Sequence, residues 1–451
     1  MNTFFTFIPL SLDVLVYKDK TTSSIVSNPI SNKRKIINDP VHGFIKINSD
    51  LLFDTIEHPF FQRLRRIKQL GLTHFVYPGA THSRFQHALG SFHLMNTAIN
   101  VLRQKGHEIT LEEEEAANCA ILLHDIGHGP FSHTLESTII QGIQHEQISL
   151  LLMHAINREM NGELDHAISV FRNRYPKKFL HQLVASQLDM DRLDYLKRDS
   201  YYTGVTEGVI GSDRIVRMLN VSGDNLVVDI KGIYSVEKFL IARRLMYWQV
   251  YFHKAAVAAE LLLRNILIRA RSLARNGENL FCSRPLGFFL YNEVGLEDFG
   301  DNSPSGRADA NENALELFAL LDDTDIMTAA KEWIRHPDPV LSRMCKNLIN
   351  RNLCRVEMQH EPFPKSVVRQ IQEAVKNKYE IADNDVKFFV ETDVISNRAY
   401  SAMDEKIQIR YNDGTLRDVS EASDLLNPLA LSGATTKHYL YYPKEVRIDL
   451  K

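Results

Sequence analysis

Residues 120–133 read AILLHDIGHGPFSH, and this stretch decides how the rest of the chain is interpreted. An apolar run leads directly into the adjacent pair His124 and Asp125, and a glycine-containing turn then presents His128 and His133. An imidazole nitrogen and a carboxylate oxygen at the end of one buried helix can both reach a single metal ion. The alternative is a pair of hydrogen-bonded polar residues that cap a helix. The further histidines and the two glycines favour the metal.

Two other segments offer further ligands. In THSRFQHALG, Arg84 and His87 are three residues apart and share a helical face, which places a guanidinium beside an imidazole. Taken alone, this segment also fits an amphipathic surface helix. Nine of the 18 histidines lie between His74 and His145, so the region is unusually rich in imidazole.

The segment DMDRLDYLKRD, residues 189–199, has the spacing of a helix with a polar face. Asp191, Tyr195 and Asp199 fall at i, i+4 and i+8 and therefore on one face. Asp194 and Arg198 fall on another face at i, i+4, where we expect a solvent-exposed ion pair.

Composition and charge limit the classes of protein to which the chain can belong. The chain has 451 residues, 44% of them hydrophobic, and a net charge of -3, which gives no global attraction to nucleic acid or acidic membranes. Its four cysteines form no CxxC pair, so a cytoplasmic protein is expected rather than a disulfide scaffold. The apolar stretch 4–15 has no basic region before it and is too short to span a bilayer, so we expect no membrane association.

The chain divides by pattern into three parts. We expect an N-terminal arm over residues 1–34, a helical core over 35–299 with a short strand at 44–47, and an α+β lobe over 300–451. The polar stretch 300–313 marks the boundary, and 235–277 is one very long helix or two closely spaced ones that stop at Gly277. The runs VKFFVET, IQIRY and HYLYYP predict strands, with a hairpin turn at residues 412–414.

The ordered set of His87, the pair at 124–125 and Asp191 resembles the HD-domain metal-dependent phosphohydrolases. The runs NDPVHG, FQRLRRIKQLG, PGATHSRFQHALG, HDIGHGPFSH, HEQ, DMDRLDYLKRD and YFHK are similar to the deoxynucleoside triphosphate (dNTP) triphosphohydrolase branch of that family. The resemblance covers about residues 35–356. It implies a mainly α fold, with an HD-domain helical bundle as core and a smaller α+β C-terminal lobe.

The resemblance also implies roles for individual residues. The metal ligands are His87, His124, Asp125 and Asp191, and the ion is Mn, Fe, Mg or Ni. The acid/base candidates are His128, His133 and His145, among which the sequence does not choose, with Glu136 placed to orient a histidine. The residues that would contact the substrate are Gln69, Leu70, Arg84, Arg192, Tyr195, Asp199, His253 and Lys254. Of these, Gln69, Leu70, Tyr195 and Asp199 would surround the sugar, and Arg84 would contact a phosphate. Arg192 stands where mammalian members have a lysine, and Glu136 stands where they have an aspartate.

A second nucleotide site is implied at a subunit interface. Its residues would be Lys35, Ile36, Asn38, Glu57, Gln62 and Arg65, although this basic run also fits a solvated helix face. Glu57 replaces an aspartate that reads guanine in mammalian members, so guanine selectivity is not implied. We expect a homodimer or homotetramer.

The function predicted first is metal-dependent hydrolysis of dNTPs to deoxynucleoside and triphosphate by water attack at the α-phosphate. Two alternatives stay open: an HD phosphohydrolase acting on nucleoside monophosphates, cyclic nucleotides or alarmones, and a non-catalytic regulator that binds nucleotides or nucleic acid. The sequence contains no GxxxxGK[ST] loop, which excludes the glycine-loop NTPases.

Overall fold

The computed structural model describes residues 33–131, 133–140, 142–300, 313–397, 400, 406–424 and 433–446. The side chains of His133, Glu136 and Ser137 also lie outside this description, as do nearly all of the predicted N-terminal arm and most of the predicted boundary stretch 300–313.

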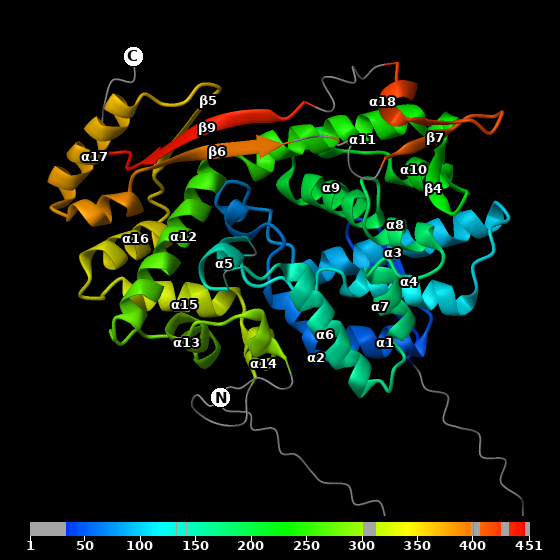
Figure 1. Cartoon of the computed structure of the whole chain (residues 1–451), viewed down its shortest axis with the longest axis horizontal. Coiled ribbons are helices and arrows are strands. Elements are labelled where there is room, and N and C mark those ends of the chain that lie inside the picture. The colour runs from blue at the N-terminus through cyan, green and yellow to red at the C-terminus, as the bar shows by residue number, and fades with distance from the viewer. Residues whose placement is uncertain are drawn as a thin grey trace, which may run out of the picture.

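Three helices pack together in the half of the molecule that lies on the right in Figure 1. Helix α3 (Arg84–Gln104) packs against both α4 (Leu111–Leu123) and α9 (Met190–Thr203). Thr110 begins α4 by accepting a hydrogen bond from the Glu113 N–H, and Gly204 ends α9 at a φ of 75°. The shorter helices of this half are α1 (Asp50–Glu57), α2 (Pro59–Gln62), α5 (His133–Thr138), α6 (His145–Glu159), α7 (Asp165–Phe171), α8 (Lys178–Val184) and α10 (Ser212–Met218).

The long helical segment predicted at 235–277 is two helices. Helix α11 (Ile233–Met246) runs into a π-helical turn over Tyr247–Tyr251, and α12 (Lys254–Arg275) follows. The segment stops at Gly277, whose φ is 88°, as predicted. The remaining helices are α13 (Arg284–Tyr291), α14 (Ala314–Leu320), α15 (Asp323–Trp333), α16 (Pro339–Ile349), α17 (Lys365–Tyr379) and α18 (Val419–Ala422).

Three small sheets complete the described fold. A hairpin joins β1 (Lys35–Asp39) to β2 (Gly43–Ile47), which includes the predicted strand at 44–47. The second sheet has the order β3 (Leu219–Ser222), β4 (Asn225–Asp229), β7 (Gln408–Arg410) and β8 (Leu416–Asp418), with β4 and β7 parallel. The third has the order β5 (Arg355–Gln359), β9 (Thr435–Tyr442) and β6 (Glu391–Asn397).

The predicted strands are confirmed at IQIRY and HYLYYP, and the 412–414 turn joins β7 to β8. The prediction for VKFFVET is wrong in its first half. A 3-10 helix over Asp383–Phe388 buries Val386 and Phe388 on the side of the core, and the strand begins only at Glu391. The fold is mainly α with an α+β C-terminal region, as the sequence predicted. Among the described helices, none combines the length and the apolar character that crossing a bilayer requires.

Candidate active site

Three elements deliver the predicted metal ligands. His87 lies in the first turn of α3, and Asp191 lies at the start of α9. The last eight residues of α4, 116–123, are all buried, so the helix leads through the core and ends where His124 and Asp125 begin the glycine-containing turn. The buried approach fixes the direction in which this pair points.

Three of the four predicted ligands, His87, His124 and Asp191, bring ligand atoms close enough together to hold one metal ion, and Asp125 lies beside them. His87 Nε2 lies 3.0 Å from Asp191 Oδ1 and 3.8 Å from Asp125 Oδ2. His124 Nε2 lies 3.3 Å from Asp125 Oδ1 and 3.5 Å from Asp191 Oδ1. Both Nε2 atoms are buried and make no hydrogen bond of acceptable geometry with any described residue. Two imidazole nitrogens aimed at two carboxylates fit a divalent cation.

The opposite ring nitrogens hold both imidazoles in place. His124 Nδ1 lies 2.6 Å from the Ile121 carbonyl oxygen, and His87 Nδ1 lies 2.8 Å from Asp194 Oδ2. Both partners are acceptors, so each Nδ1 carries a proton, and Nε2 is the nitrogen left to bind a metal.

The electrostatics of the group also favour a cation. Burial lowers the pKa of His87, but the neighbouring carboxylates of Asp191 and Asp194 outweigh it and raise that pKa to about 10. Burial would raise the pKa of Asp125 and Asp191, but the neighbouring His124 and the other cationic partners hold both well below their usual range. The carboxylates therefore stay ionised, and protons on the imidazoles balance their charge until a metal displaces them.

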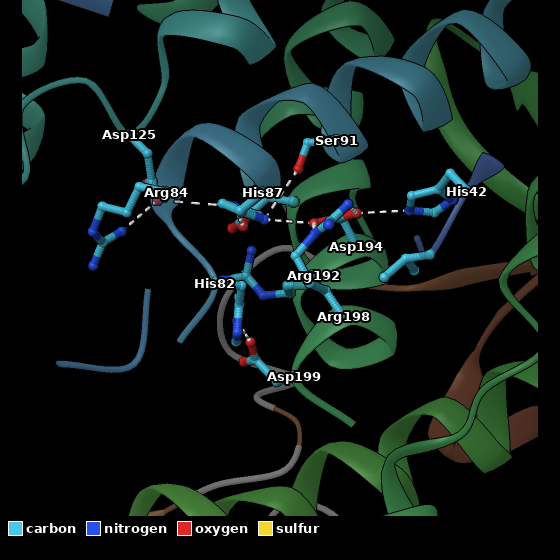
Figure 2. A network of polar contacts seen from close by, with 12 residues as sticks. His42, His82, Arg84, His87, Ser91, Asp125, Arg192, Asp194, Arg198 and Asp199 are labelled. Carbon is cyan, nitrogen blue, oxygen red and sulfur yellow. Dashed lines mark hydrogen bonds and ion pairs between the residues drawn. The ribbon is translucent and has the colours of Figure 1, made fainter. Parts of the chain in front are cut away.

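The prediction that Asp194 and Arg198 form a solvent-exposed pair is wrong. Both side chains are fully buried, and they belong to a network behind His87 that also includes His42 and Asp39 (Figure 2). Sequence reasoning missed this network because helical spacing separates faces of α9 without saying which face another helix covers. Gly90 carried the available signal: a Cβ there would lie 2.0 Å from Asp194 Oδ1.

Two of the predicted acid/base histidines lie beside the metal ligands. The rings of His128 and His145 stack with centroids 3.7 Å apart, and His128 Nε2 is 3.4 Å from Asp125 Oδ1. Gly127 lets α6 approach, since a Cβ there would lie 2.1 Å from the His145 carbonyl oxygen. The donor atoms of Asp125, His128 and His145 lie close enough together to share a metal ion as well. The side chains of His133 and Glu136 lie outside the described residues.

The two predicted phosphate-contacting arginines already have carboxylate partners. Arg84 Nη1 lies 2.7 Å from Asp125 Oδ2, so it borders the metal group directly. Arg192 pairs with Asp189, the residue that caps α9. The Arg84 guanidinium thus lies beside the predicted metal ligands, and the Arg192 guanidinium is held at the start of α9, next to Asp191.

The predicted sugar-facing residues lie around a second polar cluster. Asp199 has both carboxylate oxygens engaged, one 2.7 Å from His82 Nε2 and the other 2.7 Å from the Tyr251 hydroxyl. The Tyr195 ring lies edge-on to Tyr251, with centroids 6.4 Å apart. Sequence reasoning selected neither His82 nor Tyr251 as a substrate contact.

The remaining substrate candidates divide into two sets. The Gln69 N–H donates to the His82 carbonyl oxygen, and its own Oε1 is buried without a hydrogen-bond partner among the described residues. Leu70 is half-buried beside it. His253 caps α12 by accepting from the Ala255 N–H, whereas Lys254 is exposed and pairs with Glu357 of β5. Lys254 is therefore tied to the sheet and not to the cluster at Asp199.

The residues of the implied second nucleotide site lie on β1, α1, α2 and the turn after it. Arg65 donates to Gln62 Oε1, and Gln62 donates to the Ile56 carbonyl oxygen next to Glu57. Lys35 lies over the Phe53 ring of α1. The other two members, Ile36 and Asn38, are exposed on β1.

Comparison with known proteins identifies the family. A model of the HD domain matches residues 84–199, and a model of an HD associated region matches residues 210–277. A solved phosphohydrolase from Bacteroides thetaiotaomicron is 54% identical, covers 91% of this chain and 99% of its own, and superposes with a TM-score of 0.86. The uncharacterised YwfO of Bacillus subtilis is 31% identical over 93% of this chain and 94% of its own.

A deoxynucleoside triphosphate triphosphohydrolase SAMHD1 homolog from Dictyostelium discoideum is 33% identical over 54% of this chain. That match spans 51% of the Dictyostelium protein, so the chain covers about half of this relative's length. The HD-domain match over residues 84–199 includes His87, His124, Asp125 and Asp191, the predicted ligands. The chain therefore belongs to the HD-domain phosphohydrolases, in the branch that resembles the dNTP triphosphohydrolases.

Proposed function

We propose that this protein is a metal-dependent hydrolase of dNTPs, which it cleaves to a deoxynucleoside and inorganic triphosphate. The observation that carries the proposal is the joint placement of two groups on α3 and α9. Those helices hold His87 and Asp191 of the metal group, and α9 also holds Tyr195 and Asp199 of the sugar-facing cluster. The similarity to named dNTP triphosphohydrolases supports the choice of substrate.

The proposed metal ligands are His87, His124, Asp125 and Asp191. When bound, a divalent ion there would polarise the α-phosphate and lower the pKa of a water nucleophile. Arg84 borders this group and can contact the phosphate chain, where its planar guanidinium suits phosphate oxygens. Manganese, iron, magnesium and nickel all accept this donor set, so the identity of the ion is left to the experiment.

The chain's own residues would move the proton and select the sugar. One of His128, His133 and His145 would protonate the departing 5′ oxygen, because imidazole titrates near working pH. Asp199 and Gln69 would hold the 3′-hydroxyl. The aromatic ring of Tyr195 would occupy the space that a 2′-hydroxyl needs, which favours deoxyribonucleotides.

We also propose that the protein works as a homodimer or homotetramer. An activating nucleotide would contact the six residues Lys35, Ile36, Asn38, Glu57, Gln62 and Arg65. In support, Gln62 and Arg65 bond to each other, and the exposed Ile36 gives β1 an apolar surface in the described part of the chain. Sedimentation with and without each nucleotide tests this part separately from hydrolysis.

The test of the proposed reaction is product analysis. Purified protein loaded with Mn, Fe, Mg or Ni is incubated with each dNTP, alone and with other nucleotides present, and the products are separated by chromatography. The expected products are intact triphosphate and a deoxynucleoside, both lost in His124→Ala. A metal-loaded protein that leaves every dNTP intact would contradict the proposal, and cleavage of a monophosphate, cyclic nucleotide or alarmone would identify the alternative HD activity.

A further inference from the structure

We propose that Asp194 is a positioning residue for the metal centre, and that His42 of the β1–β2 turn completes its setting. Asp194 would fix the ring of His87 so that Nε2 faces the other ligands. The inference rests on the proposed metal-dependent function, but it concerns Asp194 and His42, which lie behind the proposed ligands and are not among them. Figure 2 shows the chain of contacts from His42 through Asp194 to His87.

Asp194 accepts hydrogen bonds on both oxygens. Oδ2 lies 2.8 Å from His87 Nδ1 and 2.9 Å from Arg198 Nε. Oδ1 lies 2.7 Å from His42 Nε2 and 3.0 Å from Arg198 Nη2. Four donor positions match the four lone-pair sites of an ionised carboxylate. The carboxylate therefore has no site left for a metal, and it acts on the metal through His87.

The surroundings hold this carboxylate rigidly. Arg198, fully buried, makes a second pair with Asp39 through its two terminal nitrogens, at 2.8 and 3.2 Å. Asp39 also accepts the backbone N–H groups of Val41 and His42, which shapes the turn that carries His42. His42 of the β1–β2 turn and Arg198 of α9 thus hold the Asp194 carboxylate from two sides.

Helix α3 provides the space for this arrangement. Gly90 follows His87 by three residues and so faces the same side of the helix. A Cβ at residue 90 would lie 2.0 Å from Asp194 Oδ1 and 2.2 Å from Arg198 Nη2. The close approach of α9 to α3 therefore exists only with glycine at this position.

Chemistry predicts what the carboxylate contributes. A carboxylate behind a metal-bound imidazole fixes its tautomer and orientation, and loss of such a partner weakens metal binding about 10- to 100-fold. An asparagine cannot replace it, because whichever way the amide is turned, its NH2 group faces donors of Arg198 and either His42 or His87. We therefore expect an effect on metal affinity that goes beyond any loss of fold stability.

The experiment measures the dissociation constant for Mn2+ by electron paramagnetic resonance of the free ion, and the visible absorption of the Co2+ complex. The variants are Asp194→Asn, His42→Ala and His42→Gln, since glutamine can return an N–H donor to the position of Nε2. Glu113→Gln is the matched control, because Glu113 is a buried carboxylate of the same core that pairs with Lys177 and contacts no ligand. Near-ultraviolet circular dichroism checks that each variant is folded.

We expect Asp194→Asn to weaken Mn2+ binding about 10- to 100-fold and to change the Co2+ spectrum. His42→Ala should weaken it severalfold, His42→Gln should restore most of the affinity, and Glu113→Gln should bind as the unaltered protein does. A folded Asp194→Asn variant with unchanged affinity overturns the inference. If that variant does not fold, unchanged affinity in His42→Ala overturns it. Binding that is equally weak in the unaltered protein and in His124→Ala would instead count against the proposed metal site.

Discussion

At the scale of single residues, the stacked pair His128 and His145 lies beside the proposed metal ligands, and a role in proton transfer predicts a different outcome from a role as ligand. His128 touches Asp125 through Nε2, while the two proposed imidazole ligands are His87 and His124. We expect His128→Asn to lower kcat by about 10²- to 10⁴-fold, the usual contribution of a general acid or base. The Mn2+ affinity should change little. Rapid-mixing kinetics and metal titration of the same preparation check this.

The matched comparison is His145→Asn. If His145 only supports the ring of His128, its loss should cost less in kcat than the loss of His128 itself. A loss of metal from His128→Asn comparable to that in His124→Ala would show that His128 is a ligand and would contradict the assignment.

The resemblance to the HD-domain family implied the proposed ligand set, and a helical period of 3.6 placed Asp191 on one face with Tyr195 and Asp199. The same period could not show that the neighbouring face of α9, which carries Asp194 and Arg198, is covered by α3 and the β1–β2 hairpin. Asp191 and Asp194 are three residues apart, yet one faces the proposed metal and the other is enclosed by α3 and the β1–β2 hairpin. That difference depends on contacts between segments more than 100 residues apart, which spacing within one helix does not contain.

At the scale of elements, the start of α16 shows how one carboxylate joins two helices. Asp338 caps α16 by accepting the Leu341 N–H at 2.7 Å, and Arg269 of α12 donates to it at 3.1 Å. Burial raises the pKa of Asp338, but the hydrogen bonds from Arg269 and Leu341 outweigh burial and lower that pKa below its ordinary value. The ionised form is thus favoured by folding.

Asp338→Asn should lower the free energy of unfolding by about 1 kcal/mol at pH 7, because asparagine still caps α16 but no longer carries the charge that pairs with Arg269. The pKa of Asp338 is lower in the folded protein than in the unfolded chain, where an aspartate has a pKa of about 3.9. Its ionised form therefore stabilises the folded protein at pH values above about 3.9, and this stabilisation is lost as the pH falls through the lower, folded-state pKa. The difference between the variant and the unaltered protein should therefore be constant from pH 7 to 5 and shrink below pH 4. Urea unfolding over this range measures it, with exposed Glu361→Gln as the control, and a difference that grows on acidification would contradict the argument.

The ends of helices and strands could be predicted where a turn-forming residue in the sequence stops the element, and could not be predicted elsewhere. Gly277 and the 412–414 turn stop their elements through backbone preferences that any sequence reader can see. The run VKFFVET has strand composition throughout, but its first residues form a 3-10 helix because Val386 and Phe388 are needed in the core beside α17. A tertiary contact there overrides a local preference.

At the scale of the whole molecule, the parts predicted as core and C-terminal lobe are joined through several contacts. Strand β7 extends the sheet that β3 and β4 begin, and α12 packs against both α16 and β5. The Asp323 carboxylate accepts the Lys68 N–H at 3.0 Å, across more than 250 residues of chain. Because the predicted core and the C-terminal lobe bury surface against each other, we expect the two parts to unfold together in one transition.

The two tryptophans of the chain provide the test, because one lies in each part. Trp248 lies in the π-helical turn before α12, with Lys437 of β9 over its ring at 4.2 Å. Trp333 is buried at the end of α15 and donates to the Phe281 carbonyl oxygen at 2.9 Å. Each ring therefore touches the other part of the chain and reports on the contact between them.

Trp333→Phe leaves Trp248 as the fluorescent reporter, and Trp248→Phe leaves Trp333. In each variant we expect unfolding in urea to have the same midpoint by fluorescence as by circular dichroism. The physical reason is that neither part can open without exposing the buried surface of the other. Two separated fluorescence midpoints, each matching only part of the circular dichroism change, would mean that the boundary near residue 300 divides two independent folding units. Coincident midpoints would mean that the C-terminal sheet helps to hold α12, and with it the tyrosine that bonds to Asp199, in place.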